Sequence, residues 1–384
     1  MFLGATVADA AARPLHWVYN QKKLQTYIKG KKDFTFLKKN KRVNIMADKV
    51  LLTGISGWIA KHIAIELLNT GYEVLGTVRS QNSLEKTKKT LSEYVSTDKL
   101  SFVELDLLKD DGWVEAAKDC KYIIHTASPY PMKSSRNREA LVPAAKGGTL
   151  RVLNAGIEAN VEKIVLTSSI AAMFKRPNRT NPYNVGENDW SDTEWSGSTD
   201  YIVSKTKAEK VAWELMESKG LKDKLTVINP GGVNGDALDD KENTSTKYVQ
   251  LFLKGKYPMA PNFGILISDV KDVAKAHVLS LKNSKVNGRR LLIGSEVKKM
   301  LEISKIMQEE FPQYAKKLPK KEMPNFMLKL ISYLDSSAKL MVPELGILMQ
   351  TDTSYAEDLL GIKFKPARDS IKDAGNSVIR LGLV

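Results

Sequence analysis

The stretch Lys49–Ala60, KVLLTGISGWIA, decides the fold. Residues 50–52 form the short apolar run that is typical of a buried parallel strand. Thr53 and the glycine after it end this run, and from Trp58 onward the segment WIAKHIAIELLNTG has helical periodicity. The glycines therefore stand where a strand turns into a helix, which is the context that a dinucleotide-binding loop requires.

The small residues of this loop are spaced G-x-x-G-x-x-A, at Gly54, Gly57 and Ala60. Gly54 allows a tight turn, and Gly57 leaves room for a pyrophosphate to approach the backbone. The helix N-terminus after the loop then faces the phosphates with free N–H groups and a positive dipole end. A flexible loop explains the same spacing, so the rest of the chain has to decide between the two interpretations.

Length and composition predict a globular protein with one large α/β unit and a smaller one, because 384 residues are long for one domain and short for three. The single cysteine, Cys120, excludes an internal disulfide framework and fits a reducing compartment, so we expect a cytoplasmic protein. Cys and His show no metal-ligand spacing, and no apolar run approaches the ~20 residues that span a bilayer. We therefore expect neither a metal site nor a membrane partner.

Residues 1–45 differ in composition from the rest of the chain. They hold ten Lys or Arg and two Asp, so +8 of the net charge of +15 lies there. Residues 1–20 resemble the opening of the ADP-ribosylglycohydrolases, but the acidic metal-binding motifs of that family are not found downstream. The lysine-rich tract 22–42 is predicted to be a solvated tail, with no specific nucleic-acid partner. We predict a poorly ordered extension ahead of Met46; Asp9 argues against the alternative of a transit peptide.

Strand and helix patterns alternate along the chain after Lys49. Further strands are predicted at residues 73–78, 100–105, 122–126, 163–167 and 225–228, with helices at 84–94, 139–159 and 201–219. Strands separated by helices predict right-handed crossovers and a doubly wound, Rossmann-type parallel sheet in an α/β protein. We assign residues 48–230 to this dinucleotide-binding domain and 231–384 mainly to a smaller substrate lobe, with a return to the main sheet near 264–281.

In such a fold, ligands gather at the carboxyl ends of the strands. After the second strand stands Arg79, with Lys86 further along the next helix and no acid to bind an adenosine ribose. A cation there suits a 2′-phosphate and favours NADP(H) over NAD(H), although surface cations of a basic protein look the same. Asp106, after the third strand, is either a partner for the adenine amino group or a turn residue.

The fourth strand ends in the sequence HTASP. His125 lies within the strand end and is predicted to be packed structurally. Thr126, Ala127 and Ser128 are small, as a backbone that passes close to a dinucleotide must be.

Ser169, Tyr201 and Lys205 carry the strongest chemical signal. The fifth strand ends in TSS, and YIVSK opens a helix whose i, i+4 spacing puts Tyr201 and Lys205 on one face. A phenol with a pKa of about 10 exchanges protons poorly at neutral pH, and a nearby ammonium favours its ionised form. Ser169 can then position the substrate oxygen, and Lys205 can also hold ribose hydroxyls. A lone Y-x-x-x-K occurs often by chance, but the upstream serine and glycines make chance a poor explanation.

Residues 48–384 resemble the extended short-chain dehydrogenase/reductases of the epimerase/dehydratase superfamily, within them the dihydroflavonol reductase, cinnamoyl-CoA reductase and aldehyde reductase branch. The matching stretches, in order, include TGISGWIAKHIAIELLNTGYEVLGTVRS, IIHTASP, KIVLTSSIAA, YIVSKTKAEKVAWE and VINPGGVNG. The resemblance implies Ser169, Tyr201 and Lys205 as the catalytic residues. It also implies a cofactor site lined by Gly54, Gly57, Trp58, Ile59, Arg79, Lys86, Asp106, Leu107, Thr126, Ala127, Ser128, Tyr201, Lys205, Pro230, Val233 and, less surely, Ser245. Asp236 stands where many relatives have proline.

These residues together predict NADPH-dependent reduction of an aldehyde or ketone to an alcohol, by a monomer or homodimer. Candidates for the substrate wall are Tyr130, Met132 and the loop 175–195, whose aromatic residues Tyr183, Trp190 and Trp195 either contact an apolar carbonyl compound or only anchor the loop. One alternative is a sugar-nucleotide epimerase or dehydratase with bound NAD, which the lysine-rich lobe and Arg79 disfavour. Another is a non-catalytic cofactor-binding protein, which the complete triad disfavours.

Overall fold

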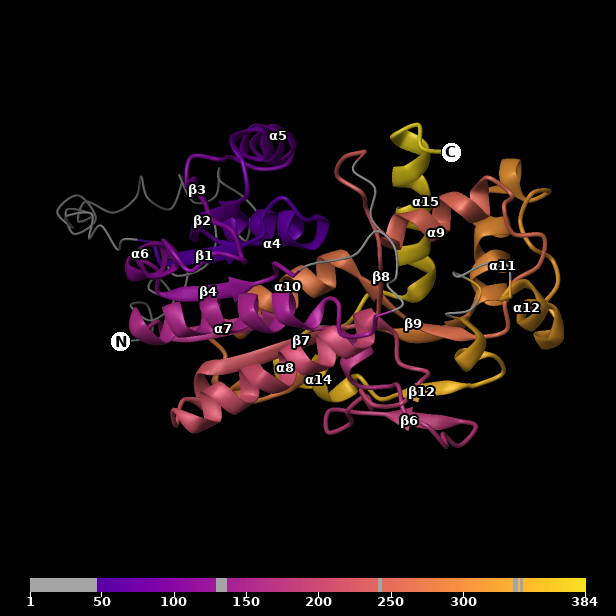
Figure 1. Ribbon diagram of the computed structural model, residues 1–384. Coiled ribbons are helices and arrows are strands. Elements are labelled where there is room, and N and C mark those ends of the chain that lie inside the picture. The colour runs from indigo at the N-terminus through magenta and orange to yellow at the C-terminus, as the bar shows by residue number, and fades with distance from the viewer. Residues whose placement is uncertain (1–46, 129–136, 241–243, 334–337, 339–340) are drawn as a thin grey trace, which may run out of the picture. The chain divides into compact units, whose positions relative to one another are not determined.

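A seven-stranded parallel sheet forms the centre of the molecule (Figure 1). The computed structural model describes residues 47–128, 137–240, 244–333, 338 and 341–384, so the predicted poorly ordered extension lies outside the described residues. The sheet has the order β10-β7-β5-β4-β1-β2-β3, which confirms the predicted doubly wound α/β class. Its strands are β1 (Lys49–Thr53), β2 (Glu73–Val78), β3 (Leu100–Glu104), β4 (Tyr122–His125), β5 (Lys163–Thr167), β7 (Leu225–Pro230) and β10 (Arg290–Ile293).

The direction in which the sheet grows changes at β1. The chain moves from β1 outward to β2 and β3, then returns to the other side of β1 and continues through β4, β5 and β7. The pair β1–β4 runs in register from Val50 opposite Tyr122 to Thr53 opposite His125. The loops after β1 and β4 therefore leave the sheet on opposite sides at a switch point, which is where open α/β sheets bind their ligands.

Alternating side chains of the central strands feed two cores, one on each face of the sheet. Val50 and Leu52 pack in one core and Leu51 in the other, because successive residues of a strand point to opposite faces. The first core also takes residues of α4 (Trp58–Asn69), α5 (Gln81–Ser92), α10 (Val270–Ser280) and α14 (Ser354–Leu360). The second takes residues of α6 (Trp113–Lys118), α7 (Val142–Glu158) and α8 (Asp200–Ser218). This explains why the strands read as continuous apolar runs.

A smaller sheet and a separate core lie in the C-terminal part of the chain. The sheet has the order β11-β9-β8, from β11 (Glu296–Lys299), β9 (Gly264–Asp269) and β8 (Gly232–Asn234). The core is built from residues of α9 (Thr244–Leu253), α11 (Met300–Glu310) and α15 (Ala367–Arg380), among others. Two further elements, β6 (Tyr183–Val185) and β12 (Met349–Thr351), pair as a parallel two-stranded sheet. The helix α12 (Asn325–Ile331) comes after α11 in the chain (Figure 1).

The return to the main sheet differs from the expectation for residues 264–281. Here β9 pairs with β8 and β11, and only α10 comes back, packing on α4. The strand that does join the main sheet is β10, beside β7. Its four residues, RLLI, lie between a basic loop and Gly294. A segment of four residues is too short for its periodicity to tell a strand from a helix. The domain boundary near residue 230 stays a prediction.

Among the described residues, no helix is long and apolar enough to cross a bilayer. No cluster of three or more His, Cys, Asp or Glu side chains in this part of the chain is arranged to hold a metal ion.

Candidate active site

The turn after β1 is held by a residue that the sequence analysis did not single out. The backbone N–H of Gly54 donates to the hydroxyl of buried Thr77 at 2.9 Å, and Ile55 N–H donates to the Thr77 carbonyl at 3.2 Å. Gly54 adopts φ +69°, and a Cβ there would lie 2.9 Å from Cβ of Ala127. Only glycine therefore fits this turn, since the strand ends of β1 and β4 meet there. A lone threonine within β2 carries no pattern that would have revealed its role.

The helix after the turn begins without a side-chain cap. Gly57 is the N-cap residue of α4, and no side chain bonds its first-turn N–H groups. A Cβ at Gly57 would meet only the Gly54 carbonyl, at 3.3 Å, so the backbone is open above this helix end. Trp58 directs its indole N–H to the carbonyl of Asp236 at 2.9 Å, and Ile59 packs partly buried against the core. The side chains of Trp58 and Ile59 are thus occupied by contacts within the protein. Their backbone N–H groups remain available to bind a phosphate.

Arg79 and Lys86 both lie on the exposed rim at the end of β2 and in α5. Within the described residues, neither cation forms a hydrogen bond or an ion pair. Ser80 caps α5 by accepting the N–H of Ser83 at 3.3 Å. Two cations without a carboxylate partner next to a helix N-terminus form a donor set that fits a phosphate group.

The residues after β3, Asp106 and Leu107, make contacts within the protein. Asp106 accepts the N–H of Leu108 at 3.0 Å, which makes it a turn residue, with its second carboxylate oxygen left for another donor. The side chain of Leu107 lies against α7, where a Cβ on Gly148 would approach it to 3.2 Å. The carbonyl of Leu107 accepts Arg151 at 2.8 Å. Only the exposed edge of this turn remains for contact with a cofactor.

The end of β4 is fixed to β1 through Thr53. Its hydroxyl accepts the N–H groups of Thr126 and Ala127, both at 3.1 Å, and lies 2.7 Å from Nδ1 of His125. Burial lowers the pKa of His125 to about 3, and the charge of Lys205 lowers it further. His125 is therefore packed and neutral, as the sequence suggested, and the partly buried residues Thr126, Ala127 and Ser128 come directly after it at the switch point.

Two adjacent serines at the end of β5 have separate environments. Ser168 is buried and donates to Glu209 at 2.5 Å. Ser169 is only partly buried and caps the 3-10 turn η2 (Ile170–Ala172) by accepting the N–H of Ala171 at 3.1 Å. Within the described chain the Ser169 hydroxyl donates no hydrogen bond, so its proton stays available for a ligand, which agrees with the choice of Ser169 over Ser168 as the chemical residue.

Tyr201 and Lys205 stand in the first two turns of α8. Thr199 caps this helix by accepting the N–H of Ile202 at 3.3 Å, so the helix begins immediately before Tyr201. Burial lowers the pKa of Lys205 to about 8, and the carboxylate of Glu209, one turn further on, acts against that shift. The Lys205 ammonium makes no hydrogen bond or ion pair within the described part of the chain. It can therefore act on a phenol or a ribose hydroxyl beside it.

The remaining predicted cofactor residues lie beyond β7. Pro230 ends β7 and is buried, and Val233 lies in β8 with 8% of its surface exposed. Between them Gly231 N–H donates to the Ser268 hydroxyl at 2.8 Å. Ser245 stands in the first turn of α9, and its side chain lies outside the described part of the structure, as do Tyr130 and Met132.

Residues 50–294 match the NAD dependent epimerase/dehydratase family. The chain belongs to this family. Cinnamoyl-CoA reductase 1 of Petunia hybrida is 34% identical, over 71% of this chain and 80% of that protein. The NADPH-dependent methylglyoxal reductase GRE2 of Saccharomyces cerevisiae is 31% identical, over 86% of this chain and 98% of that one. These relatives confirm the resemblance to the reductase branch of the extended short-chain dehydrogenase/reductases.

Solved structures extend the comparison to the fold. Yeast methylglyoxal/isovaleraldehyde reductase Gre2, solved in complex with NADPH, superimposes with a TM-score of 0.72 at 28% identity. The alignment covers 88% of this chain and all of Gre2. Gre2 from Candida albicans, also with NADPH, gives a TM-score of 0.72 at 26% identity. The epimerase/dehydratase fold therefore extends through the C-terminal lobe, beyond residues 50–294.

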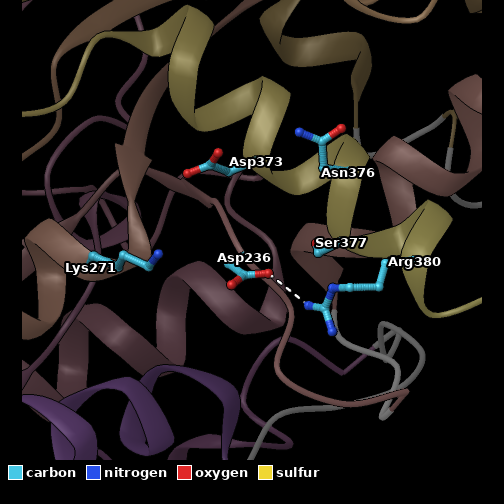
Figure 2. Close-up of a pocket in the computed structure, with 6 residues that line it drawn as sticks. All are labelled: Asp236, Lys271, Asp373, Asn376, Ser377 and Arg380. Atoms are coloured by element: carbon cyan, nitrogen blue, oxygen red, sulfur yellow. Dashed lines mark hydrogen bonds and ion pairs between the residues drawn. The ribbon is translucent and has the colours of Figure 1, made fainter. Parts of the chain in front are cut away.

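Asp236 lies in the loop after β8 and links this loop to α4 and α15. Its carbonyl accepts Trp58 Nε1 and lies 2.9 Å from His62 Nε2, both on α4. Its carboxylate pairs with Arg380 of α15 at 3.0 Å. Figure 2 shows this pair in the wall of a cavity of about 360 Å³ that is lined by Asp236, Lys271, Asp373, Asn376, Ser377 and Arg380. Asp236 thus contributes its carboxylate to this polar cavity beside α15, and its backbone carbonyl joins the loop to α4.

The aromatic residues expected in the substrate wall have mixed roles. Tyr183 lies in β6, is 3% exposed and pairs with Met349 of β12. The Trp190 ring lies 3.8 Å from the Arg290 guanidinium. Both therefore anchor the loop 175–195. Trp195 is partly buried, lies near buried Lys175, and is the candidate that remains for contact with a substrate.

Proposed function

We propose that this chain reduces an aldehyde or ketone to an alcohol with NADPH. The observation that carries the proposal is the buried ammonium of Lys205, which forms no direct ion pair or hydrogen bond among the described residues and stands one helical turn from Tyr201. The partly buried Ser169, whose hydroxyl donates to no described group, follows the end of β5. The NADPH-dependent methylglyoxal reductase and cinnamoyl-CoA reductase relatives support the same reaction class.

The residues at the switch point fit NADPH. Gly54 fills a position where a Cβ would collide with Ala127, and α4 offers an uncapped N-terminus for the pyrophosphate. Arg79 and Lys86 are free of carboxylates in the described structure and would hold the 2′-phosphate. Lys205 would hold the nicotinamide ribose hydroxyls, and Pro230 and Val233 would border the nicotinamide.

NADPH, when bound, supplies a hydride for the carbonyl carbon. The chain supplies the rest: Tyr201 donates its phenolic proton to the carbonyl oxygen, so that the carbon gains a hydride and the oxygen a proton. The Ser169 hydroxyl donates a hydrogen bond to that oxygen and stabilises the negative charge that develops there. The Lys205 ammonium stabilises the phenolate that Tyr201 becomes, until a solvent proton restores it.

The substrate is proposed only by class. Trp195 and the apolar residues near the loop 175–195 suit an apolar or aromatic carbonyl compound. The single cysteine, Cys120, is a buried free thiol, which agrees with the reducing compartment that the sequence predicts. We infer that the protein is cytoplasmic. We also infer that it is a monomer or a homodimer.

The experiment that tests this proposal measures oxidation of NADPH and of NADH with a panel of aromatic aldehydes, aliphatic aldehydes and diketones. We expect turnover with NADPH, and a kcat/KM for NADPH at least about tenfold above that for NADH, because one charge-assisted phosphate contact contributes about 1.5–3 kcal/mol. No oxidation of either cofactor, together with NAD retained by the purified protein, would contradict the proposal and favour an epimerase or dehydratase.

A further inference from the structure

Beneath the proposed triad lies a carboxylate that the reaction itself does not use. Glu209 stands one turn of α8 after Lys205, and its side chain is fully buried. It forms an ion pair with Arg290 of β10, whose side chain is 7% exposed. Removing two such charges from water is costly, so a buried pair of this kind is retained only where its contacts are complete or serve another purpose.

The hydrogen bonds of Glu209 join four separate parts of the fold. One carboxylate oxygen accepts the Ser168 hydroxyl at 2.5 Å and the Asn229 amide at 2.8 Å. The other accepts Arg290 Nε and lies 3.4 Å from the indole nitrogen of Trp213. Glu209 thereby connects α8 with the end of β5, with β7 and with β10. The carboxylate is saturated with donors, as a buried charge requires.

Of the parts that Glu209 joins, the end of β5 is the one next to the proposed catalytic residue Ser169. Ser168 directly precedes Ser169, and the same Asn229 amide that bonds Glu209 also donates to the Ser169 carbonyl at 3.2 Å. The position of Ser169 relative to α8, which carries Tyr201, is therefore fixed through one carboxylate. A displacement of about 1 Å at such a joint is enough to lower a rate about a hundredfold.

The negative charge of Glu209 also acts on the ammonium of Lys205, one helical turn away. The charged or titratable groups that act on these two residues within the described chain are Arg290 on β10, which pairs with Glu209, and His125 at the end of β4, which interacts with Lys205. His125 is neutral and Arg290 is bound to Glu209, so Glu209 is the negative charge that offsets the burial of the Lys205 ammonium. Without it, Lys205 loses its proton at a lower pH.

We propose that Glu209 is a positioning residue of the active site, which holds the Ser168–Ser169 strand end against α8 and keeps Lys205 protonated at neutral pH. The catalytic part of this proposal rests on the proposed reductase function. The protonation part concerns the chain alone and can be measured without cofactor or substrate.

The test compares Glu209→Gln with Ser168→Ala. Glu209→Gln removes the charge at nearly constant shape, whereas Ser168→Ala removes one tether and keeps the charge. Lys205 is trace-labelled with acetic anhydride across pH 6–11 in the cofactor-free full-length protein, and the labelled peptide is quantified by mass spectrometry. We expect the midpoint for Lys205 to fall by about one pH unit in Glu209→Gln and to stay unchanged in Ser168→Ala.

Activity gives the second readout. The alkaline limb of kcat/KM should move to lower pH by the same amount in Glu209→Gln, because the variant loses the active ammonium earlier as the pH rises. Ser168→Ala should lower kcat about tenfold or more while its alkaline limb and its KM for NADPH stay close to those of the wild type. Glu214→Gln, an exposed position on the same helix, is the matched control and should change neither quantity.

Glu209→Gln leaves Arg290 buried without its partner, so Glu209→Gln/Arg290→Gln replaces it if the single variant does not fold. Because the loss of the Arg290 charge opposes the loss of the Glu209 charge, a smaller fall of the Lys205 midpoint is expected in this double variant. An unchanged Lys205 midpoint in whichever variant folds, or an unchanged kcat in Ser168→Ala, overturns the proposal. A wild-type protein without any reductase activity overturns the proposed function instead, while the labelling midpoint still decides whether Glu209 keeps Lys205 protonated.

Discussion

The hydroxyl of Thr53 lies 2.7 Å from Nδ1 of His125, so the last residues of β1 and β4 are joined by a buried side-chain hydrogen bond. The same oxygen accepts the N–H groups of Thr126 and Ala127. Because its lone pairs face these two donors, the hydroxyl proton of Thr53 points to Nδ1, and His125 carries its proton on Nε2. One threonine thus fixes both the histidine tautomer and the backbone turn at the switch point.

Replacing Thr53 by valine keeps the shape but leaves two partly buried N–H groups and one nitrogen of buried His125 unbonded. We expect the free energy of unfolding to fall by about 2–3 kcal/mol, since each unsatisfied buried group costs about 1–3 kcal/mol. Urea denaturation measures this. Thr70→Val, at the exposed end of α4, is the matched control and should cost less than about 1 kcal/mol. Equal effects of the two substitutions would show that Thr53 does not organise the turn.

Gly54→Ala should lower the affinity for NADPH by more than backbone strain alone explains. Both Gly54 and Gly220 have φ near +67°, so an alanine at either position is strained by about 1–2 kcal/mol. Only at Gly54 does the new Cβ collide, with Ala127, whereas nothing lies within 4 Å at Gly220. Fluorescence titration with NADPH should show at least a tenfold loss for Gly54→Ala and none for Gly220→Ala. Similar affinities for both variants would contradict the placement of the pyrophosphate.

The cation after β2 should set the choice of cofactor. We expect Arg79→Ala to raise the Kd for NADPH about 10–100-fold and to leave the Kd for NADH unchanged, because a charge-assisted phosphate contact contributes about 1.5–3 kcal/mol. Lys88→Ala, an exposed change on the same helix α5, is the control. If Arg79→Ala weakens the binding of both cofactors equally, the 2′-phosphate lies elsewhere.

Three buried histidines should make stability fall with acid. Burial lowers the pKa of His62 and of His277 to about 4 and that of His125 to about 3. Below pH 6.5 these histidines therefore become protonated in the unfolded chain while they stay neutral in the folded chain. The free energy of unfolding should decrease by up to about 1.4 kcal/mol per histidine for each pH unit between 6.5 and 4. Urea denaturation at pH 7.0 and 5.5 checks this, and equal values at both pH values would contradict it.

The central sheet could be predicted because most of its strands are short, continuous apolar runs separated by segments with helical periodicity. The run at residues 50–52 is buried on both faces and reads without ambiguity. The strand β10 could not be predicted, because four residues carry no period and its pairing with β7 depends on contacts distant in the chain. Of the predicted return at residues 264–281, the helix α10 packs on α4 beside the main sheet, whereas the strand β9 pairs with β8 and β11, and no local pattern distinguishes these two destinations.

At the candidate site, the sequence predicted the residues proposed to bind and react. It did not predict the residues that hold them in position. Gly54, Ser169, Tyr201 and Lys205 stand at fixed spacings or at strand ends, where pattern and function coincide. Thr77 and Asn229 lie within strands, and their partners are distant in the chain, so no spacing marks them. Asp106 was open between a nucleotide contact and a turn, and only the hydrogen bond from Leu108 revealed the turn.

The most direct test of the proposed mechanism is single-turnover and steady-state reduction of a reactive aldehyde by Tyr201→Phe, beside Tyr333→Phe as an exposed control. We predict that kcat falls about 10²–10⁴-fold in Tyr201→Phe, because the proton donor is lost, while the Kd for NADPH stays within about threefold of the wild type. Tyr333→Phe should match the wild type. Turnover by Tyr201→Phe at the wild-type rate would contradict the assignment of the proton donor, and with it the mechanism.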